Sequence, residues 1–330
     1  MRSHSPLCRF SGASIATLAA LLAWSPQAAR AQAYLGTPTV DYGNATIDRS
    51  VVGTDTINLP LISPKTTITW VPDDTATGGG PINFLPAGAI VNYVGAVGGA
   101  TPYTVLNRVL PTDATRAVRF DGIVNSSNTV RVWFYSPGGI LIGSTGRFNV
   151  GGLLLSTADL VTTGGDFMPV QDQFSVAGTA GSTAAVVIQP GAQLRAEAAG
   201  QSNYVVAIAP RIQQNGLISV RGSTALVAAE SADFAVDSQG LFNITVSQGS
   251  EVASNTFVHT GSTGGPDASS GASLRRVYMV AVPKNNAIIM AIESGGAIGF
   301  DVAGAANLDG NTIVLSAGHN IADSGSGDPI

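Results

Sequence analysis

The sequence has 330 residues, 16 of them basic and 21 acidic, and a formal net charge of −5. Only two of the basic residues are lysines, and this acidic balance argues against nucleic acid as a partner, because phosphate backbones are bound by dense basic patches. An apolar fraction of 45% excludes a disordered chain. The 40 glycines follow no collagen period and helix-forming runs of Glu, Lys and Leu are absent, so the composition predicts an all-β protein.

The first 31 residues are predicted to be an export signal. An arginine-containing start precedes the apolar run Ile15–Trp24, which is too short to be a stable membrane anchor. Ala29 and Ala31 form an A-x-A cleavage motif that would leave Gln32 as the first residue. Cleavage would remove three arginines, no acid and the only cysteine, moving the formal charge from −5 to −8 and leaving no disulfides. The alternative interpretation of this segment is a buried N-terminal helix.

The stretch Val130–Thr157 sets the pattern for the rest of the chain. It holds three apolar runs, VRVWFY, GILIG and GGLLLST, each about as long as a strand. A helix would not tolerate Pro137, Gly138 and Gly139 in its middle, so we expect short strands joined by tight turns. The segment Thr163–Asp172 that follows is expected to be a polar loop.

Apolar runs recur downstream with a period of 20 to 24 residues. A period of this size indicates one supersecondary unit stacked on its neighbours, and the β-branched and glycine residues exclude leucine-rich repeats. A propeller blade needs about 40 residues, so we predict a single-stranded, right-handed parallel β-helix with one coil per period. One series of runs is Ala185–Ile188, Val205–Ile208, Ala225–Ala228, Ile288–Ile292 and Ile313–Ser316, and a second series begins at Gly191, Asn215 and Gln239.

Both ends of a parallel β-helix expose unpaired strand edges and an apolar cross-section. Residues 32–100 are irregular and contain short alternating patches, so they are expected to form an N-terminal β cap. At the other end, Ser324–Ile330 follows the coil-like run Asn311–Ala317 with no visible cap. We therefore expect that the fold is meant to continue, or that the chain is a truncated member of a longer type.

Residues that commonly carry catalytic or metal-binding chemistry are scattered. The two histidines that follow the export signal, His259 and His319, have no cysteine partners for a zinc site, which needs about four ligands. Asp233 and Asp237 would share a strand face, but no other acid or base converges on them. No nucleophile elbow, dinucleotide-binding or phosphate-binding glycine motif occurs. The sequence predicts no catalytic residue, no cofactor and no metal site.

Four segments carry a family pattern: Thr104–Val109 (TVLNRV), Phe120–Asn125 (FDGIVN), Tyr135–Gly143 (YSPGGILIG) and Phe148–Leu160 (FNVGGLLLSTADL). Together they resemble the secretion domain of two-partner-secretion exoproteins, the filamentous-haemagglutinin family. The resemblance is close over residues 100–230 and loose over 32–100. It implies an export signal at 1–31, a secretion domain with its cap at 32–175, and further coils at 176–330.

The resemblance also implies a non-enzymatic protein exported through the periplasm of a Gram-negative bacterium. A dedicated outer-membrane β-barrel transporter would recognise the unfolded domain there, and the chain would fold outside. The product would be extracellular or on the cell surface, and would serve adhesion to a ligand that the sequence does not identify.

The residues that carry the resemblance are candidates for transporter recognition or for determining the fold. The family turn is usually Asn-Pro-Asn-Gly-Ile, whereas here both asparagines are replaced, and Gly139 is expected to take a positive φ. As fold determinants, Asn107 would satisfy a turn, Arg108 would cap a carbonyl and the glycine pair would form a corner. The candidates are Asn107, Arg108, Ser136, Pro137, Gly138, Gly139, Ile140, Asn149, Gly151 and Gly152.

Other classes of function remain as alternatives. A β-helical polysaccharide-degrading enzyme would require a groove of converging acidic or basic side chains. A small secreted structural or matrix protein would require none. An autotransporter passenger would carry its own membrane barrel with a terminal aromatic residue, whereas this sequence ends in Ile330.

Overall fold

The computed structural model is all-β in the part of the chain that it describes, with 28 strands and no helix. No helix there is long and apolar enough to cross a membrane. The predicted export signal and the C-terminal residues 318–330 lie outside the described residues. The described residues are 32–60, 64–74, 79–95, 102–168, 170, 172–198, 203–236, 242–252, 256–266 and 276–282, with the strand backbone alone at 290–292, 297–300 and 312–317.

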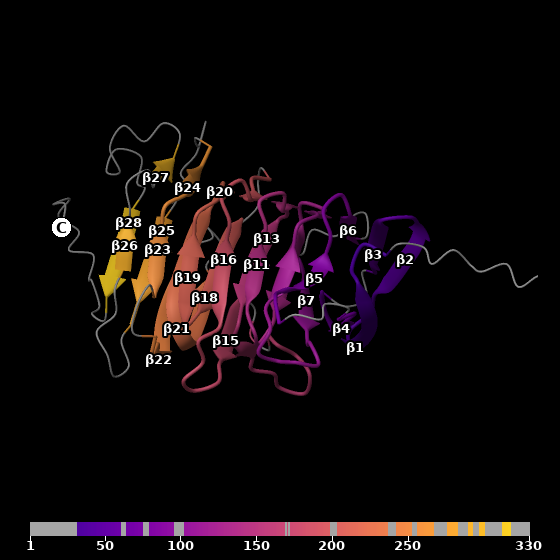
Figure 1. Ribbon diagram of the computed structural model, residues 1–330, viewed down its shortest axis with the longest axis horizontal. Helices are drawn as coiled ribbons and strands as arrows, with labels where there is room; N and C mark the ends of the chain where they lie inside the picture. The colour runs from indigo at the N-terminus through magenta and orange to yellow at the C-terminus, as the bar shows by residue number, and fades with distance from the viewer. Residues whose placement is uncertain are drawn as a thin grey trace, which may run out of the picture.

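The strands form three sheets that wind into a parallel β-helix (Figure 1). The first sheet contains, in spatial order, β1 (Gly36–Tyr42), β4 (Lys65–Pro72), β7 (Tyr103–Val109), β10 (Val130–Tyr135), β13 (Gly152–Ser156), β18 (Tyr204–Ala209), β21 (Ser223–Val236), β25 (Arg276–Ala281) and β28 (Thr312–Ala317). The second contains β5 (Ile82–Leu85), β8 (Val118–Phe120), β11 (Ile140–Ile142), β16 (Ala185–Ile188), β19 (Arg211–Gln214), β23 (Phe257–His259) and β26 (Met290–Ile292). The third contains β2 (Thr46–Val51), β3 (Thr54–Leu59), β6 (Ile90–Gly95), β9 (Ile123–Ser126), β12 (Arg147–Asn149), β17 (Gln193–Ala196), β20 (Leu217–Val220), β24 (Ser262–Gly265) and β27 (Ala297–Phe300).

One complete coil consists of β10, β11 and β12, after which β13 pairs with β10 in parallel. The stretch Val130–Thr157 is therefore one coil and the start of the next, which confirms short strands around a Pro-Gly-Gly corner. Alternate side chains from all three sheets point into one core. The rings of Phe84, Phe120, Phe134 and Phe148 stack there with centroids 5.0–6.1 Å apart.

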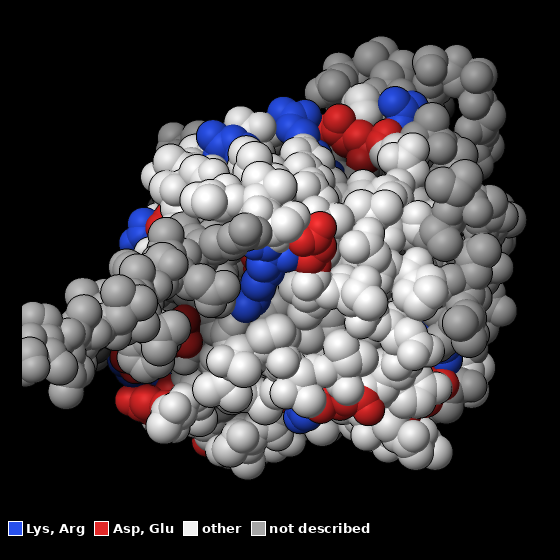
Figure 2. All heavy atoms as spheres, turned by 90° about the vertical axis from the view of Figure 1, so that its right-hand side faces the viewer, with Lys and Arg blue, Asp and Glu red and all other residues white. Residues whose placement is uncertain are grey.

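Antiparallel strands close the N-terminal end, as the predicted cap requires. Strand β1 pairs antiparallel with β4, and β2 pairs antiparallel with β3, whereas the coils behind them pair in parallel. Ala33 and Tyr34 are fully buried in this end, and the Tyr34 ring stacks on Phe84 with centroids 4.6 Å apart. Figure 2 looks onto the capped end, where uncharged surface dominates and basic side chains lie beside acidic ones.

The two predicted series of coil strands are partly wrong. Strand β16 (185–188) lies in the second sheet, whereas 205–208 and 225–228 lie in the first. The run after Gln239 includes β22 (Phe242–Gly249), which pairs antiparallel with β21 outside the coils. All three sheets share the same inward alternation, so an apolar run does not reveal its sheet. Coil length also varies, because Tyr204 pairs with Ser223 but Thr224 pairs with Val277.

A second layer, the extra-helical sheet, covers the outer face of the first sheet. It consists of β14 (Asp159–Leu160), β15 (Gln173–Ala177), the second half of β21 and β22, all antiparallel. Trp133 of the first sheet packs against Phe174 with ring centroids 4.6 Å apart, in a core separate from that of the coils. The predicted polar loop at Thr163–Asp172 is wrong in part, because Phe167 and Met168 are buried in this second core.

Candidate functional site

Asn107 lies in the middle of β7 and points into the core, where it is fully buried. Its carbonyl oxygen accepts hydrogen bonds from Trp70 Nε1 (3.1 Å) and from the Tyr93 hydroxyl (2.9 Å). Its amide group donates to the backbone oxygen of Trp133 at 3.2 Å. The prediction that Asn107 satisfies a turn is therefore wrong, because this side chain ties β4, β6 and β10 together across the core.

The Asn107 network continues to the first described residues of the chain. The hydroxyl groups of Tyr93 and Tyr34 lie 3.2 Å apart, and burial raises the pKa of both phenols. Fully buried Asp55 accepts hydrogen bonds from the backbone N–H groups of Ala33 and Tyr34, each at 3.1 Å. Arg49 balances that carboxylate at 3.3 Å. Gln32, the predicted first residue after cleavage, thus directly precedes a segment held in the cap.

Arg108 follows Asn107 and points outward, onto the opposite face of the first sheet. Its guanidinium group forms an ion pair with Asp159 of β14 and lies 5.8 Å from the centre of the Tyr135 ring. The hydrogen bond with Asp159 raises the pKa of Arg108, and burial raises the pKa of Tyr135 to about 12. The prediction of a carbonyl cap is wrong, because Arg108 instead attaches the extra-helical sheet to the coils.

Three basic side chains on the outer face of the first sheet bind aspartates of the segment 159–172. Lys65 pairs with Asp166 at 2.7 Å, Arg131 pairs with Asp172 at 2.7 Å, and Arg108 pairs with Asp159. The Arg131 side chain is only 9% exposed, so its pair is the most shielded basic partner of the three. Together the pairs hold this segment, which we call the clamped segment, against three successive strands.

Gly152 makes room for one of these contacts. The Arg131 guanidinium group lies 5.4 Å from the centre of the Tyr204 ring, and Gly152 sits between them in the strand order. A Cβ atom at Gly152 would lie 3.1 Å from Arg131 Cγ and 3.2 Å from Tyr204 Cζ. At Gly151 a Cβ atom would lie 2.3 Å from the backbone oxygen of Asn128, so the preceding coil excludes any side chain there.

The turn Ser136–Ile140 forms the corner between β10 and β11. Gly139 has a φ of +122°, which confirms the predicted positive φ, and its N–H group donates to the Ser136 oxygen at 3.3 Å. A Cβ atom at Gly138 would lie 2.3 Å from the backbone oxygen of Arg116. Ser136 and Ile140 are buried, whereas Pro137 and Gly138 are half-buried and line a hollow of about 610 Å³. The glycines therefore determine this corner.

Asn149 lies apart from the other candidates, on the exposed face of the third sheet. Its amide donates to Asn125, whose own amide donates to Asn92, each at 3.1 Å. The three side chains form an asparagine ladder across three coils. The candidates thus occupy the core, the outer face of the first sheet, a corner and the third sheet, and do not form one compact site.

The other titratable residues of interest do not gather into a metal site. In the described ranges, no three His, Cys, Asp or Glu side chains lie close enough together to hold a metal ion. His259 is buried in β23 with its Nε2 atom 2.9 Å from Thr263 Oγ1, and burial lowers its pKa. Asp233 is exposed on the extra-helical sheet. Asp237 and His319 lie outside the described residues.

The functional candidates missed from the sequence are the acidic partners. Asp159, Asp166 and Asp172 hold the clamped segment, and Asp55 holds the start of the cap. A signal was present: Lys65, Arg108 and Arg131 stand on apolar strands, where a basic side chain needs a partner once it is covered.

No protein-family model and no curated protein matches the sequence. The architecture is similar to the crystal structure of the HMW1 secretion domain from Haemophilus influenzae, with a TM-score of 0.52 and 18% sequence identity. The match covers 85% of this chain and 73% of that chain. The chain has the fold of a secretion domain. That fold is what the family resemblance implied.

Proposed function

We propose that the chain is a secreted exoprotein of a two-partner system, exported by an outer-membrane β-barrel transporter of a Gram-negative bacterium. The observation that carries the proposal is the shared secretion-domain fold, a β-helix with an antiparallel cap and an extra-helical sheet. The motif residues support it, because each of them builds a specific part of this fold.

The structure suggests how folding outside the cell would favour export. Each coil that docks on the cap buries a further set of inward side chains, and each large apolar side chain contributes about 1.5–3 kcal/mol when fully buried. Asn107 joins strands from three coils, so its network forms only when the first coils are stacked. A folded coil would then oppose return of the chain through the transporter.

The burial of the motif residues separates two modes of recognition. Asn107, Gly139 and Ile140 are buried, so a transporter would contact their side chains or backbone only before folding. Pro137 and Asn149 are accessible in the folded domain. We infer that recognition uses the unfolded segment, consistent with a corner that glycine geometry already explains.

Export assays with the co-expressed transporter test the proposal. Deleting residues 32–160 is expected to abolish appearance of the chain in the medium, while a periplasmic pool remains. Replacing Asn149 with alanine is the matched point control, because it removes one exposed ladder side chain and leaves the cap intact. Undiminished secretion of the deleted chain, or secretion without the transporter, would refute the proposal.

A further inference from the structure

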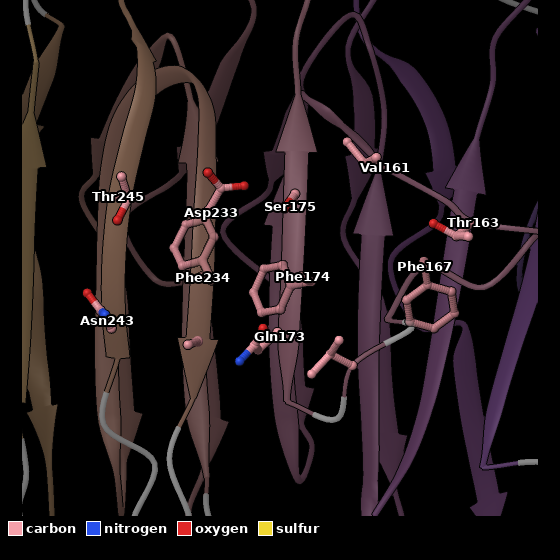
Figure 3. A pocket seen from close by; sticks show the side chains of 12 residues that line it. Val161, Thr163, Phe167, Gln173, Phe174, Ser175, Asp233, Phe234, Asn243 and Thr245 are labelled. Carbon is pink, nitrogen blue, oxygen red and sulfur yellow. The ribbon is translucent and has the colours of Figure 1, made fainter.

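A groove of about 580 Å³ lies on the outer face of the extra-helical sheet (Figure 3). Three antiparallel strands, β15, β21 and β22, present their outward side chains to it in two rows. The first row is Ser175, Asp233 and Thr245, and the second is Gln173, Ala235 and Asn243. Neighbouring strands lie about 4.8 Å apart, so the two amides flank a gap about 10 Å wide above the small Ala235 side chain.

The polar side chains of the groove are not used to hold the fold. In the described part of the chain, no hydrogen bond or ion pair within the protein engages the side chains of the two rows. The opposite face of the same strands supplies the packing, where Phe174 and Phe234 stack with centroids 4.9 Å apart. The outward groups are therefore available to a ligand, and they can be replaced without disturbing the second core.

The charge of the groove selects the ligand chemistry. Asp233 is the one charged side chain that lines it among the described residues, and neither lysine nor arginine contributes. A phosphate, sulfate or uronate group would meet repulsion here. A carboxylate accepts strong hydrogen bonds from hydroxyl groups, and the amides of Gln173 and Asn243 both donate and accept.

Apolar surface completes the groove at one end. Val161 and Val170 line it and are 50% and 55% exposed, although both are large apolar side chains. Figure 3 shows Val161 and Thr163 beside the strand that carries Ser175. A sugar ring presents hydroxyl groups at its edge and C–H groups on its faces, which matches polar rows next to exposed valines.

We propose that this groove binds a neutral oligosaccharide, with Asp233 and the two amides accepting and donating hydrogen bonds to its hydroxyl groups. The proposal rests on the exoprotein function only in that export would bring the groove outside the cell. Its occupant is neutral because the groove lacks a cation, and it is hydroxylated because every polar lining group pairs with hydroxyls.

Calorimetric titration of the exported, full-length mature chain tests the proposal. The probes are hexasaccharides of glucose, mannose and N-acetylglucosamine, with hyaluronan hexasaccharide and polysialic acid as anionic probes and hexalysine as a cationic one. At least one neutral hexasaccharide is expected to bind. The double variant Asp233→Ala, Asn243→Ala is expected to weaken that binding at least tenfold, whereas Ser247→Ala, on the same strand outside the groove, leaves it unchanged.

Three outcomes would overturn the inference: no neutral hexasaccharide binds at millimolar concentration, an anionic or cationic probe binds more tightly, or the double variant binds as well as the parent chain. Secretion of the same variants is measured in parallel and is expected to stay at the parent level. Normal export with no saccharide binding would overturn this inference alone. Export that does not depend on the transporter would overturn the proposed function alone.

Discussion

Replacing Asn107 with alanine removes the one side chain that links three coils through the core. The change leaves Trp70 Nε1 and the Trp133 oxygen without their partner, whereas the Tyr93 hydroxyl keeps Tyr34 nearby. A buried polar group without a partner costs about 1–3 kcal/mol, and the cavity adds to that, so we expect a loss of about 2–5 kcal/mol. Against a typical total of about 5–15 kcal/mol, this loss is large.

Urea unfolding of the mature chain measures this loss. The chain after residue 31 contains two tryptophans, Trp70 and Trp133, and both lie at the network, so their fluorescence reports on its opening. Asn149→Ala is the matched control, because it removes the same amide from an exposed ladder. Equal stability of the two variants would refute the reasoning that Asn107 acts as a core tie.

Three further predictions concern the clamped segment and the C-terminal coils. Arg131→Met is expected to destabilise the fold by about 2 kcal/mol, but Arg108→Met by less than about 1 kcal/mol, because their side chains are 9% and 31% exposed; equal urea midpoints would contradict this ranking. Gly152→Ala is expected to separate Arg131 from Tyr204 and speed proteolysis of the clamped segment, whereas Gly80→Ala, with no atom within 4 Å of its Cβ position, should not. Burial lowers the pKa of His259, so the folded chain binds this proton less readily than the unfolded chain, and stability is full above about pH 6.5 and falls as the pH drops through that value, by at most about 1.4 kcal/mol per pH unit. His259→Gln should remove that part of the pH dependence of the melting temperature, and an unchanged profile would show that other groups cause it.

Much of the fold could be predicted from residue types. Val, Ile and Leu alternate with polar residues, glycine and proline interrupt each run, and these two facts exclude helices and require short strands. The positive φ of Gly139 was predictable for the same local reason, since the turn geometry depends on the residues of the turn itself. The assignment of runs to sheets failed, because inward alternation is identical in all three.

The candidate residues show the same division. Their positions in the motif segments were available from the sequence, but their roles were not. Asn107 and Arg108 are adjacent, yet strand geometry sends one into the core and the other to the outer face. Arg108 meets Asp159, 51 residues away, and no local pattern encodes that separation.

The sequence by itself determined an all-β chain of short strands, its glycine corners and its parallel coiling, because these depend on local backbone preference and on alternation of apolar side chains. Only the tertiary structure decided which strand lies in which sheet, which aspartate holds each basic side chain, and where the extra-helical sheet packs. Coils of unequal length bring distant residues together, and burial then converts an ordinary polar side chain such as Asn107 into a tie between coils.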